Sequence, residues 1–272
     1  MRLVILILVF PFCLSAQPIK VMTYNIRYDN PGDGINQWSN RKEKVFALIR
    51  KYDPAVLGVQ EALHHQLEDI TRALPEYAFV GVGRDDGNQK GEFSALLFKK
   101  EKFEMLAENT FWLSETPEVP GSKDWDAAIT RVATWARLRH RDSGNEFLVI
   151  NTHFDHIGKV ARKESATLLK SRAEILAKDA PVIITGDFNC TREDAPYQVM
   201  MERTGLLLND PSPADPPGTF CNFGVGAMTC QPIDYIFPSK EWKVDTYQVI
   251  SDNDGKNYPS DHLPVMINVS YQ

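Results

Sequence analysis

The chain has 272 residues, of which 43% are hydrophobic and 24% are charged. This length suits one large α/β domain with a substantial core, or two small domains, and the absence of low-complexity runs and repeats excludes a solenoid or coiled coil. The formal net charge of −6 disfavours non-specific coating of DNA, which needs a positive surface, but bound cations could still offset clustered acids in a nuclease.

The first 16 residues have the pattern of a secretory signal peptide. Arg2 is followed by the apolar run 3–12 and then by small residues up to Ala16. The run is too short to span a bilayer, so we expect no stable membrane insertion. We therefore expect cleavage after Ala16 and export to the periplasm or beyond. The alternative, a buried first strand, is less favoured because a better strand follows at 19–26.

Three of the four cysteines lie beyond this leader. An odd number in an exported protein leaves at least one free thiol. Cys221 and Cys230 are close together in a glycine-rich segment, and they are the favoured pair. The sequence contains no Cys-x-x-Cys pattern, which argues against a structural zinc site.

Short β-rich segments alternate with amphipathic helices along the rest of the chain. Strands are predicted at 20–26, 55–59, 78–82, 94–98, 134–139, 147–152, 182–186, 233–237, 244–250 and 265–270. Helices are predicted at 40–52, 63–74, 163–178 and about 191–204, the first with a capping box of Asn40 and Glu43 and the last capped by Thr191.

The strands are too numerous for a simple doubly wound sheet, and neighbours such as 78–82 and 94–98 suit antiparallel pairing. This pattern predicts two packed sheets with helices outside. Because no Pro/Gly/Ser linker divides the chain, residues 17–272 are expected to form a single domain, and we expect a monomer. Segments 110–129 and 209–229 are predicted as long surface loops, where substrate contacts often occur.

Polar side chains cluster at the ends of the predicted strands. The clusters are Asn25, Gln60-Glu61, Asn151-Thr152-His153, Gly186-Asp187-Phe188-Asn189, Asp234 within 232–237, and Ser260-Asp261-His262. Acids, amides and imidazoles that project from strand ends toward one edge can form a hydrolytic site.

Each of these residues also has a structural explanation. Glu61 could cap the helix that follows it, and Asp187 could form an ordinary Asx turn. His153 and His262 could be hydrogen-bonded core histidines. Asp234 within an apolar strand needs a partner, because an unpaired buried carboxylate is costly, and His262 is a natural one.

Taken together and in this order, the clusters resemble the endonuclease/exonuclease/phosphatase superfamily. The resemblance spans about residues 21–269. It implies an α/β fold, a four-layer sandwich of two packed mixed β-sheets flanked by helices, which makes residues 17–272 one catalytic domain. The run 151–156 looks most like the branch that contains deadenylase-type exonucleases and related exported bacterial proteins.

The resemblance also implies a metal site. Glu61 would be the main ligand of Mg²⁺ or Mn²⁺, with Asn25 and Asp261 completing the set. Oxygen ligands suit these hard cations.

The catalytic roles follow from the same resemblance. Asp187 and Asn189 would hold the attacking water and the scissile phosphate. His262 would act on the phosphate or the water, with Asp234 fixing its tautomer. His153 would donate to a phosphate oxygen or assist the leaving group. The reaction would be in-line attack of water on phosphorus.

Three further residues are candidates for substrate binding. Arg131 follows a long loop and could grip a phosphate bidentately. Arg84, in a glycine-rich turn, could do the same, and Trp112 could stack on a base or sugar. The alternatives are a surface arginine, an ordinary turn and loop-core packing.

These observations predict a metal-dependent phosphoester hydrolase, with a phosphodiesterase or nuclease-like activity favoured. The substrate would be a nucleotide, a short nucleic acid, or a phosphorylated sugar or lipid headgroup. Two alternatives stay open: a phosphomonoesterase acting on sugar, inositol or lipid headgroup phosphates, and a non-catalytic binding module. A hydrolysis assay with and without metal separates the enzymes from the binding module.

Overall fold

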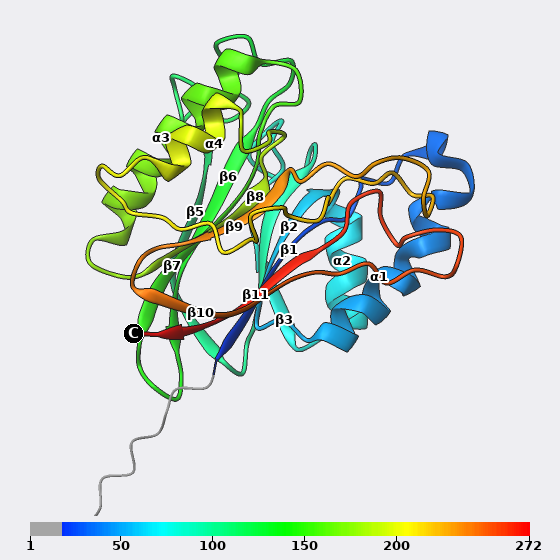
Figure 1. Cartoon of the computed structure of the whole chain (residues 1–272), viewed down its shortest axis with the longest axis horizontal. Helices are drawn as coiled ribbons and strands as arrows, with labels where there is room; N and C mark the ends of the chain where they lie inside the picture. Colours follow the sequence, from blue (N-terminus) through cyan, green and yellow to red (C-terminus); the bar gives the residue numbers. More distant parts are fainter. Residues whose placement is uncertain (1–17) are drawn as a thin grey trace, which may run out of the picture.

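The computed structural model describes residues 18–272, and the predicted signal peptide lies outside this range. Two β-sheets pack face to face, with helices on both outer sides (Figure 1). The predicted four-layer α/β sandwich is therefore confirmed. Within the described residues, no helix has the length and apolar character needed to cross a membrane.

The first sheet has six strands in the order β10-β11-β1-β2-β4-β3. Its strands are β1 (Ile19–Asn25), β2 (Val56–Ala62), β3 (Tyr77–Val80), β4 (Phe93–Lys99), β10 (Trp242–Val249) and β11 (Val265–Tyr271). Helices α1 (Trp38–Tyr52) and α2 (His64–Ala73) cover its outer face, and a short 3-10 helix, η1 (Pro31–Asn36), precedes α1 (Figure 1). Only β1 and β2 pair in parallel in this sheet.

The second sheet has five strands in the order β5-β6-β7-β8-β9. Its strands are β5 (Phe103–Trp112), β6 (Val132–His140), β7 (Glu146–His153), β8 (Val182–Asp187) and β9 (Asp234–Pro238). Helices α3 (Lys159–Ala177) and α4 (Ala195–Met201) lie on the side of this sheet away from α1 and α2 (Figure 1). Here β7 and β8 form the parallel pair.

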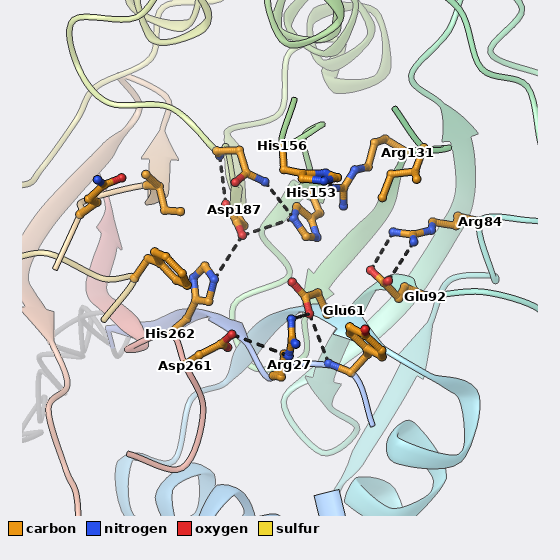
Figure 2. Close-up of a pocket in the computed structure, with 16 residues that line it drawn as sticks. Arg27, Glu61, Arg84, Glu92, Arg131, His153, His156, Asp187, Asp261 and His262 are labelled. Atoms are coloured by element: carbon orange, nitrogen blue, oxygen red, sulfur yellow. Dashed lines mark hydrogen bonds and ion pairs between the residues drawn. The ribbon is translucent and has the colours of Figure 1, made fainter. Parts of the chain in front are cut away.

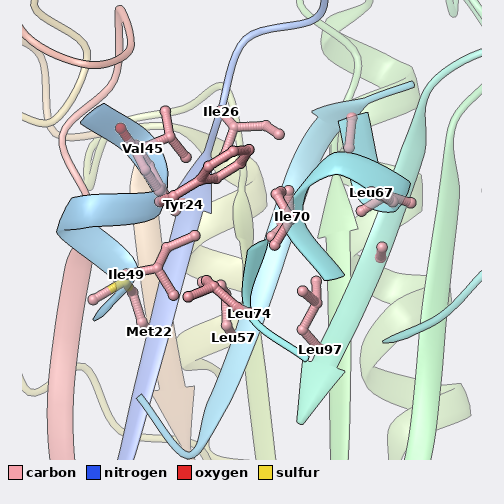
Figure 3. Close-up of a cluster of buried hydrophobic side chains, with 14 of the residues drawn as sticks. Met22, Tyr24, Ile26, Val45, Ile49, Leu57, Leu67, Ile70, Leu74 and Leu97 are labelled. Atoms are coloured by element: carbon pink, nitrogen blue, oxygen red, sulfur yellow. The ribbon is translucent and has the colours of Figure 1, made fainter. Parts of the chain in front are cut away.

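Apolar side chains fill three layers of the sandwich. One cluster, which includes Val56, Phe147 and Ile183, lies between the sheets, and another joins α3 and α4 to the second sheet. The third lies under α1 and α2, where Ile49 and Ile70 meet Leu57 of β2 (Figure 3). Strands buried on both faces explain why continuously apolar segments predicted the sheet interiors well.

A polar layer crosses the sandwich below the strand ends. Asn151 of β7 donates hydrogen bonds to the carbonyl oxygens of Val59 and Ala95 in the opposite sheet, at 2.9 and 2.8 Å. The sheets approach so closely here that a Cβ atom on Gly58 would lie 2.3 Å from the hydroxyl of Thr185. These contacts hold the two parallel strand pairs in register and bring their carboxyl ends to one edge.

Three sequence predictions differ from the structure. Strand β5 falls outside the predicted strands because its first seven residues include charged, largely exposed side chains at the sheet edge. Helix α1 begins at Trp38, so Asn40 lies inside it and the predicted capping box is wrong. Helix α4 begins at Ala195, and the hydroxyl of Thr191 bonds Asp194 instead of capping the helix.

Candidate active site

A pocket of about 640 Å³ opens where the parallel strand pairs of the two sheets end. Side chains from both sheets point into it (Figure 2). Its lining includes Arg27, Glu61, Arg84, Glu92, Arg131, His153, His156, Asp187, Asn189, Asp261 and His262. The structure thus brings together polar clusters that are far apart in the sequence.

Asp234 and His262 form a buried pair at the back of this pocket. The Nδ1 atom of His262 lies 2.8 Å from Oδ2 of Asp234, so the predicted hydrogen bond is confirmed. Burial opposes charge on the ring, but the carboxylates of Asp234 and Asp187 outweigh it and hold the pKa of His262 well above its usual value. His262 is therefore protonated at neutral pH and is a cation suited to a phosphate oxygen.

Asp187 lies at the end of β8, directly opposite Asp234 in the sheet. Its Oδ2 atom accepts a hydrogen bond from the amide of Asn25 at 3.0 Å, and its Oδ1 atom accepts the backbone N–H of Asn189 at 3.0 Å. Burial and the nearby Asp234 raise the pKa of Asp187 to about 7. A carboxylate with this pKa is suited to general base catalysis near neutral pH.

His153 adjoins Asp187 on the other side. The amide of Asn189 donates to its Nε2 atom at 3.0 Å and also to the carbonyl oxygen of Phe154. Burial and the positive charges of Arg131 and Arg84 hold the pKa of His153 well below its usual value. His153 is thus a neutral imidazole beside a protonated one, and its role toward the leaving group stays a prediction.

The expected metal ligands lie on the opposite wall. Glu61 and Asp261 line the pocket, and the Oε1 atom of Glu61 accepts a hydrogen bond from the Asn25 amide at 3.0 Å. The side-chain Oδ1 atom of Asn25 accepts a hydrogen bond from the backbone N–H of Arg27. In this structure Asn25 therefore bridges the carboxylates of Glu61 and Asp187, and its ligation of a metal stays a prediction.

The donor set fits a divalent cation. Glu61, Asp187 and Asp261 crowd around one pocket, and burial together with Glu61 raises the pKa of Asp261, with the positive charge of His262 opposing the shift. Clustered buried carboxylates are stabilised by a hard cation. Among residues 18–272, the group of three acids and histidines whose ligand atoms lie within 4.8 Å of one another is a different one, Asp187, Asp234 and His262. We assign it to proton handling, because Nδ1 of His262 is already bound to Asp234.

The sequence analysis did not identify Arg27 as a site residue. Its Nη1 atom lies 3.7 Å from Glu61 and its Nε atom 3.8 Å from Asp261 (Figure 2). Asp33 accepts two hydrogen bonds from its guanidinium. Arg27 and Glu61 have left-handed backbone conformations, with φ of 57° and 60°. Such outliers are characteristic of functional sites, but positive φ leaves no mark in a non-glycine sequence.

Arg131 lies deep in the pocket wall. Its side chain is 5% exposed, and within the described residues its Nε and Nη1 atoms have no hydrogen-bond partner. Its Nη2 atom lies 3.2 Å from Nδ1 of His156. Burial and the neighbouring Arg84 lower the pKa of Arg131. The Nε atom of Arg131 also lies 4.0 Å from the carboxylate of Asp155. A guanidinium with free hydrogen-bonding capacity can bind an anion, and phosphate binding by Arg131 stays a prediction.

Arg84 and Trp112 behave differently from what we predicted. Both Nη atoms of Arg84 donate to the carboxylate of Glu92, at 2.7 and 2.8 Å. Trp112 is 4% exposed and its indole N–H donates to the carbonyl oxygen of Arg84 at 2.7 Å. Trp112 therefore supports the pocket wall from behind, and its burial removes the predicted stacking on substrate.

The cysteines follow the prediction. Cys221 and Cys230 form a disulfide, and Cys190 is a buried free thiol. The disulfide closes a loop whose flanking residues, Phe220 and Gln231, line the pocket. The Phe220 ring packs beside His262, with ring centroids 5.0 Å apart.

The order and the geometry of these groups agree with one family of hydrolases. Residues 22–262 match the model of the endonuclease/exonuclease/phosphatase family. The chain belongs to this family. The match covers every strand-end cluster on which the sequence prediction depended.

Solved structures of similar proteins extend the comparison. The chain is 38% identical to the Bacteroides thetaiotaomicron mannosyl-6-phosphatase, with a TM-score of 0.86 over 93% of this chain and 100% of that one. It is 37% identical to another family member from the same organism, with a TM-score of 0.88 over 94% and 99% of the chains.

Curated relatives include Nocturnin from Mus musculus, which is 23% identical over 94% of this chain. This match agrees with the branch that the motifs indicated. The chain spans 66% of the length of that protein.

Proposed function

We propose that this protein is a divalent-metal-dependent phosphomonoesterase that acts on a phosphorylated sugar. The observation that carries the proposal is Arg131, a buried guanidinium in the pocket wall whose Nε and Nη1 atoms have no hydrogen-bond partner among residues 18–272. A terminal phosphate carries close to two negative charges at neutral pH and offers three free oxygens, whereas a diester carries one charge and offers two. Arg131 together with protonated His262 suits the monoester better.

The similarity to a mannosyl-6-phosphatase supports the same substrate class, since that protein is 38% identical over nearly the whole chain. The sequence motifs alone favour a phosphodiesterase, which is the second candidate. One feature favours it: the pocket lining continues on one side of Asp187 toward His262 and on the other toward Arg84 and Glu92 (Figure 2). The ring of Phe220 lies beside His262. A diester needs room for a substituent on each side of phosphorus.

The side chains present can perform the hydrolysis of a monoester. Ionised Asp187 accepts a proton from the attacking water as the new P–O bond forms, and the bond to the sugar oxygen breaks in line with it. His262 and Arg131 donate hydrogen bonds to the phosphoryl oxygens as charge develops. A divalent cation held by Glu61 and Asp261 would neutralise further charge on those oxygens. The sugar oxygen takes up a proton from solvent, Asp187 returns the proton it accepted to solvent, and the products are the free sugar and inorganic phosphate.

The test is a substrate panel with Mg²⁺, Mn²⁺ or excess chelator. We expect kcat/KM for mannose 6-phosphate and p-nitrophenyl phosphate to exceed that for bis(p-nitrophenyl) phosphate by at least about tenfold. Arg131→Met should remove most monoesterase activity, whereas Arg139→Met, on the exposed side of β6, should not. Faster hydrolysis of the diester, or full activity in chelator, would contradict the proposal.

A further inference from the structure

Arg84 and Glu92 form an ion pair at one end of the active-site pocket. Both lie in the loop that joins β3 to β4. Each carboxylate oxygen accepts one hydrogen bond from the guanidinium, at 2.7 and 2.8 Å. The side chains are 14% and 16% exposed, and both line the pocket (Figure 2). A pair this well enclosed has a fixed geometry but still presents polar atoms to a ligand.

This pair is poorly suited to bind phosphate. Both Nη atoms of Arg84 are occupied by Glu92, and the carboxylate would repel a second anion. The pair as a whole is close to neutral. Within the described residues Nε of Arg84 makes no hydrogen bond, and each oxygen of Glu92 keeps a free lone pair. Donors and acceptors side by side match hydroxyl groups, each of which can both donate and accept.

The surrounding structure holds the pair rigidly. The backbone N–H of Arg84 donates to the carbonyl oxygen of Glu92 at 3.1 Å, which closes the base of the loop. The buried indole of Trp112 fixes the carbonyl oxygen of Arg84 from behind. Side chains that are ordered before binding lose little entropy when a ligand arrives, which favours selective recognition.

The Arg84–Glu92 pair also lies close to the residues that would bind the phosphate, where the sugar leaving group of a substrate would be. Arg84, Glu92, Arg131 and His153 all line the same active-site pocket. A phosphate bound by Arg131 beside His153 would place the adjoining part of the substrate against the carboxylate of Glu92. The active-site pocket therefore has an anion site at Arg131 and a neutral, hydrogen-bonding wall at Arg84 and Glu92.

We infer that Arg84 and Glu92 form a subsite that recognises the hydroxyl groups of a sugar attached to the scissile phosphate. This inference rests on the proposed phosphomonoesterase function and names the residues that would select the sugar of the substrate. Glu92 accepts hydrogen bonds from sugar hydroxyls, and Arg84 donates to them while keeping the carboxylate in place.

The test compares a sugar phosphate with a phosphate that lacks hydroxyl groups. Glu92→Gln keeps the shape of the side chain but removes its charge and one acceptor. We expect its kcat/KM for mannose 6-phosphate to fall at least about tenfold more than its kcat/KM for p-nitrophenyl phosphate, because sites that hydrogen-bond a substrate hydroxyl discriminate strongly. Equal losses on the two substrates would overturn the inference, since the pair would then have only a structural role.

A matched control is Glu146→Gln, which breaks the comparable pair with Arg139 at 2.8 Å on exposed parts of β6 and β7. This variant should leave the ratio between the two substrates as in the wild type. If Glu92→Gln fails to fold, competitive inhibition of the wild-type protein by D-mannose and by cyclohexanol gives the same comparison. Mannose must bind more tightly than cyclohexanol, and equal binding would refute the subsite.

Failure of the proposed function has a different signature. A wild-type protein that hydrolyses no monoester refutes the phosphatase assignment. Calorimetric titration of that protein with D-mannose in the presence of inorganic phosphate still decides the subsite: saturable binding that Glu92→Gln weakens at least tenfold supports it, and no binding overturns it.

Discussion

Replacing Asp234 with asparagine should lower kcat by a factor of about 10² to 10³ with a smaller change in KM. The carboxylate is 3% exposed and bonds Nδ1 of His262 at 2.8 Å. Asparagine keeps the volume but removes the charge that favours the protonated ring, and its amide nitrogen can select the wrong tautomer. An orienting aspartate in a serine protease contributes up to about 10⁴ in rate.

The structure indicates a smaller loss than that limit. Oδ2 of Asp187 lies 3.7 Å from Nε2 of His262, so a second carboxylate remains to stabilise the imidazolium after Asp234 is neutralised. The free protein should keep its fold, because asparagine fills the same space and can still accept a hydrogen bond from the ring.

The assay is steady-state hydrolysis of p-nitrophenyl phosphate at saturating Mg²⁺, with metal affinity and circular dichroism measured on the same samples. Asp234→Asn should bind metal and retain the wild-type spectrum. His262→Ala should be similarly impaired, and the double variant should be little worse than either single one, because the two residues act as a unit. A kcat within threefold of the wild type, or losses that multiply in the double variant, would refute this reasoning.

Four further predictions concern the metal, the acid chemistry and the disulfide. Chelation should abolish hydrolysis, and added Mg²⁺ or Mn²⁺ should restore it. Glu61→Gln should weaken metal binding, measured by calorimetry, without altering the fold. An unchanged metal affinity would exclude Glu61 as a ligand. Because Asp187 must be ionised to accept a proton, kcat/KM should fall as the pH drops through the pKa of Asp187. That pKa is about 7 without metal and lower with a bound cation. A pH profile of kcat/KM that is flat from 5 to 8 would contradict this role. The folded-state pKa of Asp187 lies above the unfolded value of about 3.9, so ionisation of Asp187 destabilises the folded protein increasingly between roughly pH 4 and 7. In a thermal-shift assay, Asp187→Asn should therefore raise the Tm of the metal-free protein by a few °C at pH 8 and by less at pH 4.5. Reducing the disulfide, or replacing Cys221 and Cys230 with alanine, should lower the free energy of unfolding by about 2.5 kcal/mol for a separation of 9 residues, measured by denaturant titration; an unchanged midpoint would show that the cross-link adds no stability.

Much of the fold could be predicted from the sequence because its strands are buried on both faces. Segments such as 147–150 are continuously apolar, and turns and polar clusters follow them. Those clusters also indicated the family, since Glu61, Asp187 and His262 occur in a specific order. The predicted pair of Asp234 and His262 followed from a physical rule, that a carboxylate in an apolar strand must have a partner.

Strand β5 was the exception. It lies at the edge of its sheet, where one side of the backbone has no neighbouring strand and most side chains face solvent. Its composition therefore lacks the apolar pattern on which strand prediction depends.

Other features depend on contacts that local patterns do not encode. Arg84 is a residue type that often binds phosphate, and only the structure shows that both of its Nη atoms already donate to Glu92. Trp112 lies in a segment predicted as a loop, yet it is buried behind that pair. The position of Arg27 between Glu61 and Asp261 results from a left-handed backbone turn. The sequence thus determined which chemical groups gather at the strand ends. The packing of the two sheets decided which of these groups face the pocket and which hydrogen-bond to one another. Hydrogen bonding between distant residues depends on ångström-scale separations that only the folded chain sets.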